Sequence, residues 1–368
     1  MTSTDAFRSW AEIDTAALRH NARIARERAG TAAALLAVVK ANAYGHGLAG
    51  VAEALAGDAQ LFGVANLREA IQAREVIPQP VLIMGPALPA ERAEIVARRF
   101  IASVSSSAEA AEFSEVARGQ SVAVNCTVDT GMGRMGMHES DAVPEVKRIA
   151  ELPNVRIHSI STHLPAGDED AEFTRTQLSR FDALMARIRS EMPGDYLIHA
   201  LPSAGVISFS DSAYDAVRAG LMLYGISPMP EFQKTLRPAL TLKARVVLVR
   251  DLPAGASISY GRTFITQRPI RVATLGVGYA DGLPRAISNR GAAVLIGGQR
   301  CAVLGRVTMD LTVVDVTHLP EVQAGDEVVL IGRQGREEIL ATEVAKRAST
   351  IAWEIFTGIG TRVARVYL

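Results

Sequence analysis

The chain lacks the features that mark several large classes of protein. Its 368 residues include only two cysteines, Cys126 and Cys301, which lie far apart and predict neither a disulfide framework nor a metal-binding knuckle. Lysine plus arginine and aspartate plus glutamate both number 39, so net charge gives no support to binding of nucleic acid or an anionic membrane. The first residues hold no apolar signal segment, and no later apolar run could span a bilayer. We therefore expect a cytoplasmic protein that needs no metal ion.

Short apolar runs alternate with amphipathic segments through the first two thirds of the chain. This alternation predicts an α/β fold with eight parallel strands, a TIM-type (β/α)8 barrel, although a doubly wound open sheet also fits. The expected strands are residues 35–39, 61–65, 81–84, 101–104, 122–128, 156–162, 197–201 and 216–218. The expected helices are residues 16–30, with Thr15 as a cap, 67–76, 90–99, 108–118, 142–151 and 171–190.

The pattern changes near residue 230, which predicts a second domain. Strand-like runs separated by Gly, Pro and Asp turns follow at residues 242–250, 271–277, 292–296, 312–316 and 327–331, with one short helix at 341–347. We expect a barrel domain at residues 1–232 and a C-terminal, mostly β domain at residues 233–368. The extreme N-terminal strand is free to join the β domain.

The most informative stretch is LAVVKANAYGHG, residues 36–47. Lys40 follows a continuous apolar run, at the end of a barrel strand where such folds keep their chemistry. Desolvation there would lower the pKa of the lysine amine and favour the neutral form that reacts as a Schiff-base former. On this segment alone, a lysine that merely marks the end of a strand is an equal alternative.

Other polar residues follow the later strands. His163 comes after the sixth strand, Ser203 after the seventh, and Arg218 ends the eighth, just before Gly220 and Leu221. Barrels of this kind bind phosphate in the loops after strands seven and eight, where small residues let the backbone approach. A lysine after strand one and a phosphate site after strands seven and eight together favour pyridoxal 5′-phosphate (PLP) as the cofactor.

Arg218 indicates which PLP chemistry the site favours. PLP enzymes usually place a carboxylate against the pyridine nitrogen, whereas an arginine would leave that nitrogen unprotonated and weaken the electron sink. Return of a proton to Cα then competes well with transamination and decarboxylation, which suits racemisation. The alternative for Arg218 is a surface ion pair. Racemisation needs a second acid/base, for which Tyr260 in ISYGRTF and Tyr279 in GVGYADGLPR are candidates, although such tyrosines are usually packed aromatics.

Taken together, these motifs resemble the alanine racemase family of fold-type III PLP enzymes over nearly the whole chain. The motifs are AVVKANAYGHG, VDTGMGRMG, STHL, VRAGLMLYG, ISYGRTF, GVGYADGLPR, GRVTMD and IAWEIFTGIGTRV. The resemblance implies a barrel followed by a β domain, racemisation of alanine that supplies D-alanine for peptidoglycan, and a homodimer whose active sites borrow residues from the partner's β domain.

The resemblance also implies a role for each matching residue. Lys40 would hold PLP and act as one base, and Tyr260 of the partner subunit would act as the other. The cofactor would contact Tyr44, Arg134, His163, Ser203, Arg218, Gly220 and Leu221. The substrate would contact Arg134, Tyr279 and, from the partner subunit, Met309, with Asp168, Arg285 and Arg306 beside Tyr279 at the entrance.

The chain departs from the usual pattern of this family at several positions, among them Ala219, Leu283, Thr308 and Leu311, and two further departures bear on the site. Thr127 stands where many members carry a carbamylated lysine that orients the arginine of GMGR, here Arg134, and Trp353 replaces a tyrosine that contacts phosphate. A racemase with serine or a broader substrate set is therefore the first alternative. A second alternative is a PLP-binding carrier without activity, but such a protein would lack the β domain. A third is a fold-type III decarboxylase, which would need a carboxylate in place of Arg218 and a catalytic cysteine. Cys301 lies in no motif that resembles such a cysteine.

Overall fold

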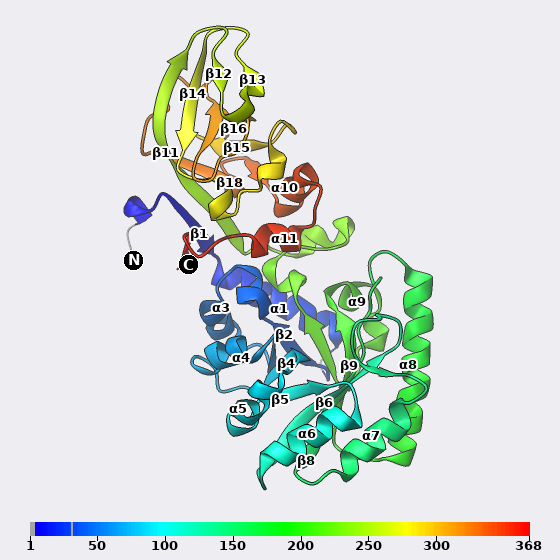
Figure 1. The fold of residues 1–368 in the computed structure, drawn as a ribbon. Helices are drawn as coiled ribbons and strands as arrows, with labels where there is room; N and C mark the ends of the chain where they lie inside the picture. Colours follow the sequence, from blue (N-terminus) through cyan, green and yellow to red (C-terminus); the bar gives the residue numbers. More distant parts are fainter. Residues whose placement is uncertain (1–3, 31) are drawn as a thin grey trace. The chain divides into compact units, whose positions relative to one another are not determined.

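The computed structural model describes residues 4–30 and 32–368, which form two compact units (Figure 1). We call Ala17–Ala43 with Leu48–Arg237 the barrel unit. The β unit comprises the residues up to Ala16, the short segment Tyr44–Gly47 and Pro238–Leu368. The boundary expected between residues 232 and 233 stays a prediction. No described helix combines the length and apolar character needed to cross a membrane.

The barrel unit is built on a closed ring of parallel strands. Their order around the ring is β2-β3-β4-β5-β6-β8-β9-β10, with β10 pairing back to β2. The strands are β2 (Ala34–Val38), β3 (Leu61–Val64), β4 (Val81–Pro86), β5 (Ile101–Val104), β6 (Val122–Asp129), β8 (Val155–Ser161), β9 (Leu197–Pro202) and β10 (Ala216–Ala219). The predicted barrel is confirmed, and closure excludes the open sheet. Both faces of β3 and β5 are buried, and their sequences, LFGV and IASV, are apolar apart from Ser103.

Helices lie outside the barrel strands, the first before β2 and the others in the connections that follow the strands (Figure 1). They are α1 (Thr15–Ala29), α3 (Leu48–Leu55), α4 (Leu67–Arg74), α5 (Arg92–Ala97), α6 (Ser107–Ala117), α7 (Ala142–Glu151), α8 (Ala171–Glu191) and α9 (Ser203–Ser208). Side-chain caps start several of them: Asn66 begins α4, Ser106 begins α6 and Asp170 begins α8. Thr15 is the first helical residue and not the cap, and its hydroxyl donates to the carbonyl of Leu368 at 2.6 Å.

The β unit holds a second, mostly antiparallel sheet in the order β19-β18-β15-β16-β17-β14-β11-β1-β20. Its strands are β1 (Ser9–Ile13), β11 (Leu240–Leu252), β14 (Ile270–Leu275), β15 (Ala293–Ile296), β16 (Gln299–Leu304), β17 (Thr312–Asp315), β18 (Glu327–Gln334), β19 (Glu337–Ile339) and β20 (Ala364–Tyr367). A hairpin of β12 (Ser257–Ile258) and β13 (Phe264–Ile265) and helices α10 (Ala341–Ala348) and α11 (Ala352–Thr357) complete it. The N-terminal strand β1 pairs with β11 and β20.

Candidate active site

Lys40 starts a single left-handed turn directly after β2. The turn, α2 (Lys40–Tyr44), has φ between 51° and 54° at each of residues 41–44, none of which is glycine. Each such residue costs roughly 1–2 kcal/mol relative to the right-handed conformation. The surrounding structure therefore has to hold this turn in place, and a strained backbone of this kind is typical of functional sites.

A cavity of about 310 Å³ at the carboxyl ends of the barrel strands is lined by four of the residues predicted for the site: Lys40, Arg134, His163 and Arg218. No carboxylate is found among the described residues that line it. Burial, and then the charges of Arg134 and Arg218, lower the pKa of the Lys40 amine, whereas the charge of Glu69 raises it. The lysine behaves as the desolvation argument predicts.

Arg218 is buried among hydrogen-bond acceptors. Its side chain is only 5% exposed, and its guanidinium donates to the carbonyls of Thr162 at 2.5 Å and Ala200 at 2.8 Å. It also donates to Nδ1 of His199 at 3.0 Å and Nδ1 of His163 at 3.2 Å. The alternative of a surface ion pair is therefore wrong. Burial lowers its pKa to about 10, which still leaves it charged at neutral pH.

Two histidines beside Arg218 are held neutral. Burial and the adjacent Arg218 charge lower the pKa of His163 to about 3, and the same two causes place the pKa of His199 well below its usual value. The sequence analysis did not select His199, which lies on β9 beside β10. A histidine within the apolar strand LIHALP, next to the strand that carries Arg218, was the signal that could have found it.

The loop before Arg134 is organised by Asp129, the last residue of β6. One carboxylate oxygen of Asp129 accepts hydrogen bonds from the N–H of Gly131 at 2.9 Å and of Met132 at 2.7 Å, and the other accepts from Gly133 at 2.9 Å. The loop is thus fixed one residue before Arg134 without any group at position 127. This anchor also escaped the sequence analysis, although the Asp followed by small residues in VDTGMGR is a typical turn signal.

Thr127 belongs to a polar network beneath the cavity. The side-chain Nδ2 of Asn125 donates to the hydroxyls of Thr127 at 3.2 Å, Ser161 at 3.0 Å and Ser103 at 3.3 Å. The hydroxyl of Ser159 donates to the side-chain Oδ1 of Asn125 at 2.9 Å. All but Thr127 are buried. Thr127 therefore contributes a neutral hydroxyl to the cavity wall.

The two loops expected to bind phosphate meet through Ser203, which begins α9. Its hydroxyl accepts hydrogen bonds from the N–H of Gly220 at 3.0 Å and of Met222 at 3.2 Å, and Leu221 lies between these two residues. The structure thus brings Ser203, Gly220 and Leu221 together. None of the three is among the residues that line the cavity of Lys40.

The remaining residues predicted to bind the cofactor or substrate or to transfer a proton lie in the β unit, whereas Asp168, predicted for the entrance, lies in the barrel unit. Tyr44 is buried, and burial raises the pKa of its phenol to about 12. In contrast, Tyr260 is 72% exposed, Met309 52% and Tyr279 41%. The segments of Tyr279 and Met309 meet, because the N–H of Ala280 donates to the carbonyl of Met309 at 3.0 Å.

The segment Tyr44–Gly47 is fixed by the C-terminal residues of the chain. The guanidinium of Arg365 donates to the carbonyl of Gly45 through Nε at 3.0 Å and Nη2 at 2.8 Å. The hydroxyl of Tyr367 donates to the carbonyl of His46 at 3.1 Å. Tyr44 is therefore held from within the β unit.

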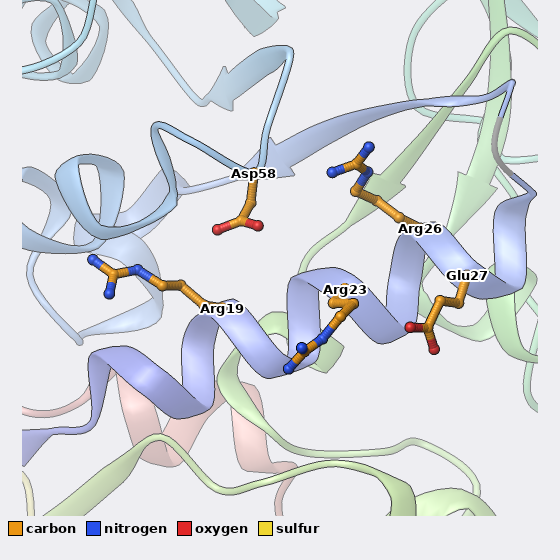
Figure 2. Close-up of a pocket in the computed structure, with 5 residues that line it drawn as sticks. All are labelled: Arg19, Arg23, Arg26, Glu27 and Asp58. Atoms are coloured by element: carbon orange, nitrogen blue, oxygen red, sulfur yellow. The ribbon is translucent and has the colours of Figure 1, made fainter.

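A second cavity, of about 360 Å³, lies beside α1 and is lined by Arg19, Arg23, Arg26, Glu27 and Asp58. Figure 2 shows Arg19 and Arg26 on the side of α1 that faces Asp58, whereas Arg23 and Glu27 point away from it. Because the guanidinium groups do not converge, this cavity lacks the geometry of an anion site.

Comparison with known proteins matches both parts of the chain. Residues 13–228 match the family model "Alanine racemase, N-terminal domain", and residues 239–367 match "Alanine racemase, C-terminal domain". An alanine racemase from Methylacidiphilum infernorum is 43% identical over 98% of this chain and 92% of its own length. One from Symbiobacterium thermophilum is 42% identical over 98% and 97%.

Solved structures agree with this result. The alanine racemase from Streptomyces lavendulae superposes with a TM-score of 0.92 at 36% identity, covering 98% of this chain and 97% of that chain. The enzyme from Clostridium difficile superposes with a TM-score of 0.93 at 30% identity, covering 99% and 96%. The chain therefore belongs to the alanine racemase family of PLP-dependent isomerases.

Proposed function

We propose that the chain interconverts L-alanine and D-alanine with PLP, using Lys40 and Tyr260 as the two bases. The observation that carries the proposal is the cationic cavity in which Lys40, with a lowered pKa, shares the wall with Arg218 and Arg134. Full-length relatives named alanine racemase support the choice of substrate.

The residues present fit PLP, an anionic cofactor with an aldehyde and a pyridine nitrogen. The cavity has cationic walls and, among its described lining residues, no carboxylate. The buried Nε of Arg218 has no hydrogen-bond partner within the described structure. Its N–H is therefore available to donate to the pyridine nitrogen of PLP. Ser203, Gly220 and Leu221 would hold the phosphate, joined by Tyr44, whose raised pKa keeps its phenol a donor.

When bound, PLP supplies an electron sink that makes the α-proton of an amino acid removable. Arg218 stays charged and cannot accept a proton, so it would hold the pyridine nitrogen unprotonated and limit that sink. His163 and His199, kept neutral, keep Arg218 oriented through their Nδ1 atoms. This arrangement favours return of the proton to Cα, as racemisation requires.

Proton transfer would take place on the two faces of Cα. In the L-to-D direction, the phenol oxygen of Tyr260 takes the α-proton, and Nζ of Lys40 gives a proton to the opposite face; the roles exchange in reverse. The lowered pKa of Lys40 suits an amine that must both accept and release a proton near neutral pH. Arg134 and the Met309 backbone N–H would hold the substrate, with Tyr279 at its entrance.

We further propose that the active protein is a homodimer in which Tyr260 and Met309 come from the partner subunit. The exposure of both side chains in the single chain supports this. A mixing experiment tests it: Lys40→Ala and Tyr260→Phe are each expected to abolish turnover, and co-refolding the two should restore part of it, because each heterodimer has one intact site. Tyr260→Phe should still bind PLP.

The assay follows D-alanine formation from L-alanine, with the absorbance of bound PLP recorded alongside. Turnover with Lys40 recovered as the PLP-modified residue after borohydride reduction is expected. Turnover of Tyr260→Phe at the wild-type rate would rule out its role, and faster turnover of serine than of alanine would reassign the substrate. We place the reaction in the cytoplasm, where its D-alanine would serve peptidoglycan synthesis; the two free, buried cysteines are compatible with a reducing compartment.

A further inference from the structure

Helix α4 begins with a capping box in which only one half forms. The sequence Asn66-Leu67-Arg68-Glu69 has the N-x-x-E pattern, and the Asn66 side chain accepts from the N–H of Glu69 at 3.1 Å. In a complete box the glutamate would return to the N–H of Asn66. Instead, Glu69 accepts from the N–H of Ala65 at 2.9 Å with Oε2 and from the N–H of Asn42 at 3.2 Å with Oε1.

Asn42 is the second residue after Lys40 and lies within the left-handed turn. Its N–H would otherwise lack a partner in a one-turn segment, and its side chain accepts from the N–H of Leu48 at 2.9 Å. Within the turn, the N–H of Ala43 also donates to the carbonyl of Val39 at 2.8 Å. Glu69 therefore supplies a side-chain hydrogen bond to the strained backbone that follows Lys40.

Glu69 also brings a negative charge to a site crowded with positive charge. Of the charged groups that shift the pKa of Lys40, Arg134 and Arg218 lower it and Glu69 alone raises it. His163, on the loop after β8, also faces Lys40 but is held neutral. The charge of the Glu69 carboxylate thus opposes the effect of the two guanidinium groups on Lys40.

We propose that Glu69 is a positioning residue that fixes the left-handed turn after Lys40 and so presents the amine to PLP. The inference rests on the proposed function, because it takes Lys40 as the residue that holds PLP. The hydrogen bond to Asn42 sets the direction of the chain as it leaves β2. The charge of Glu69 makes a smaller, opposing contribution to the pKa of the Lys40 amine, which burial and the two arginines lower.

The barrel unit contains a matched control. Helix α6 begins with the same half-formed box: the Ser106 hydroxyl accepts from the N–H of Glu109 at 3.1 Å, and Oε2 of Glu109 accepts from the N–H of Ser105 at 2.8 Å. This is the same step of four residues back along the chain that Glu69 makes to Ala65. Glu109 makes no hydrogen bond to the turn after Lys40 among the described residues, so Glu109→Gln reports the loss of a helix start alone.

The first test compares Glu69→Gln with Glu109→Gln in the full-length protein. One amide oxygen cannot accept from both Ala65 and Asn42 in the way a carboxylate does, and the amide NH2 would face a second donor. We expect the dissociation constant for PLP to rise about tenfold in Glu69→Gln, which corresponds to about 1.4 kcal/mol. Glu109→Gln should bind PLP as the wild type does, with a similar shift in melting temperature.

The second readout is the pH dependence of PLP capture by the apoenzyme, followed by absorbance. The neutral amine reacts, so the rate rises as pH passes through the pKa of Lys40. Removing the negative charge at position 69 lowers that pKa further, and the midpoint of the profile should move to lower pH in Glu69→Gln. A purely structural effect would slow capture without moving the midpoint.

The variant Glu69→Asp separates the effect of side-chain length from the effect of charge. The shorter carboxylate keeps the charge but cannot span both N–H groups, so the PLP affinity should fall while the midpoint stays near that of the wild type. The proposal is overturned if Glu69→Gln matches Glu109→Gln in both PLP affinity and midpoint, or if Glu69→Asp binds PLP as tightly as the wild type. Failure of the wild type to be modified at Lys40 by PLP and borohydride would instead refute the proposed function.

Discussion

Arg218 and His199 are joined by a hydrogen bond of 3.0 Å in which only the arginine can donate. Nδ1 of His199 must therefore be the acceptor, and the proton of the neutral ring lies on Nε2. The same reasoning applies to His163, whose Nδ1 lies 3.2 Å from Nη2 of Arg218. Two neutral rings and three backbone carbonyls, those of Thr162, His199 and Ala200, thus fix the guanidinium expected at the pyridine nitrogen.

Replacing Arg218 by lysine should cost both stability and activity. Lysine keeps the charge, but its single nitrogen cannot replace both Nη1, which donates to His199, and Nη2, which donates to the carbonyls of Thr162 and Ala200. A buried acceptor left without a partner costs about 1–3 kcal/mol. We expect a lower melting temperature and at least a tenfold fall in kcat, which is about 1.4 kcal/mol in barrier. The exposed Arg268→Lys is the control. Wild-type kcat in Arg218→Lys would contradict the role of the guanidinium.

Acid should destabilise the protein through His163. Its pKa is about 3 in the folded protein and 6.5 in the reference state, so between these values the unfolded chain binds more protons. The free energy of unfolding should fall as pH drops below 6.5, by up to about 1.4 kcal/mol per pH unit from this group. In urea titrations at a series of pH values, the free energy of unfolding of His163→Gln should fall less steeply with decreasing pH than that of the wild type. His318→Gln, at an exposed position, should keep the wild-type slope. Equal slopes in all three would refute the prediction.

Asp129→Asn should loosen Arg134 without emptying the cofactor site. The carboxylate accepts three backbone N–H groups, and an amide must turn its NH2 toward at least one of them. We expect the KM for alanine to rise about tenfold, equivalent to about 1.4 kcal/mol, with the absorbance of bound PLP retained. Asp326→Asn, which alters a turn carboxylate that accepts from Gln323, is the control. An unchanged KM would show that Arg134 is oriented by another group.

Gly45→Ala should disrupt the segment that carries Tyr44. A Cβ at Gly45 would come within 1.9 Å of the Phe356 carbonyl oxygen, and φ there is +78°. Backbone must shift, so a large fall in melting temperature and weaker PLP binding are expected. At Gly57 a Cβ would meet nothing within 4 Å, so Gly57→Ala should change stability by no more than about 1 kcal/mol. Comparable melting curves for the two variants would contradict this account.

The sequence by itself determined the barrel and the residues that follow its strands. Runs such as LFGV and IASV are buried on both faces. Short runs without alternation of apolar and polar residues are typical of parallel strands covered by helices. Because the carboxyl ends of such strands meet, the sequence also predicted that Lys40, His163 and Arg218 share one cavity. The β unit was predicted from turns and strand runs, although β12, β13, β16, β19 and β20 were missed.

Only the tertiary structure decided what supports those residues. His199 stands within an apolar strand sequence, and it lies beside Arg218 because β9 and β10 are neighbours in the ring. Glu69 has the sequence of an ordinary helix start, and its side chain reaches the turn after Lys40 only because β2 and β3 pair. The left-handed turn itself could not be predicted from its non-glycine residues, because local preference opposes it and contacts distant in the chain stabilise it.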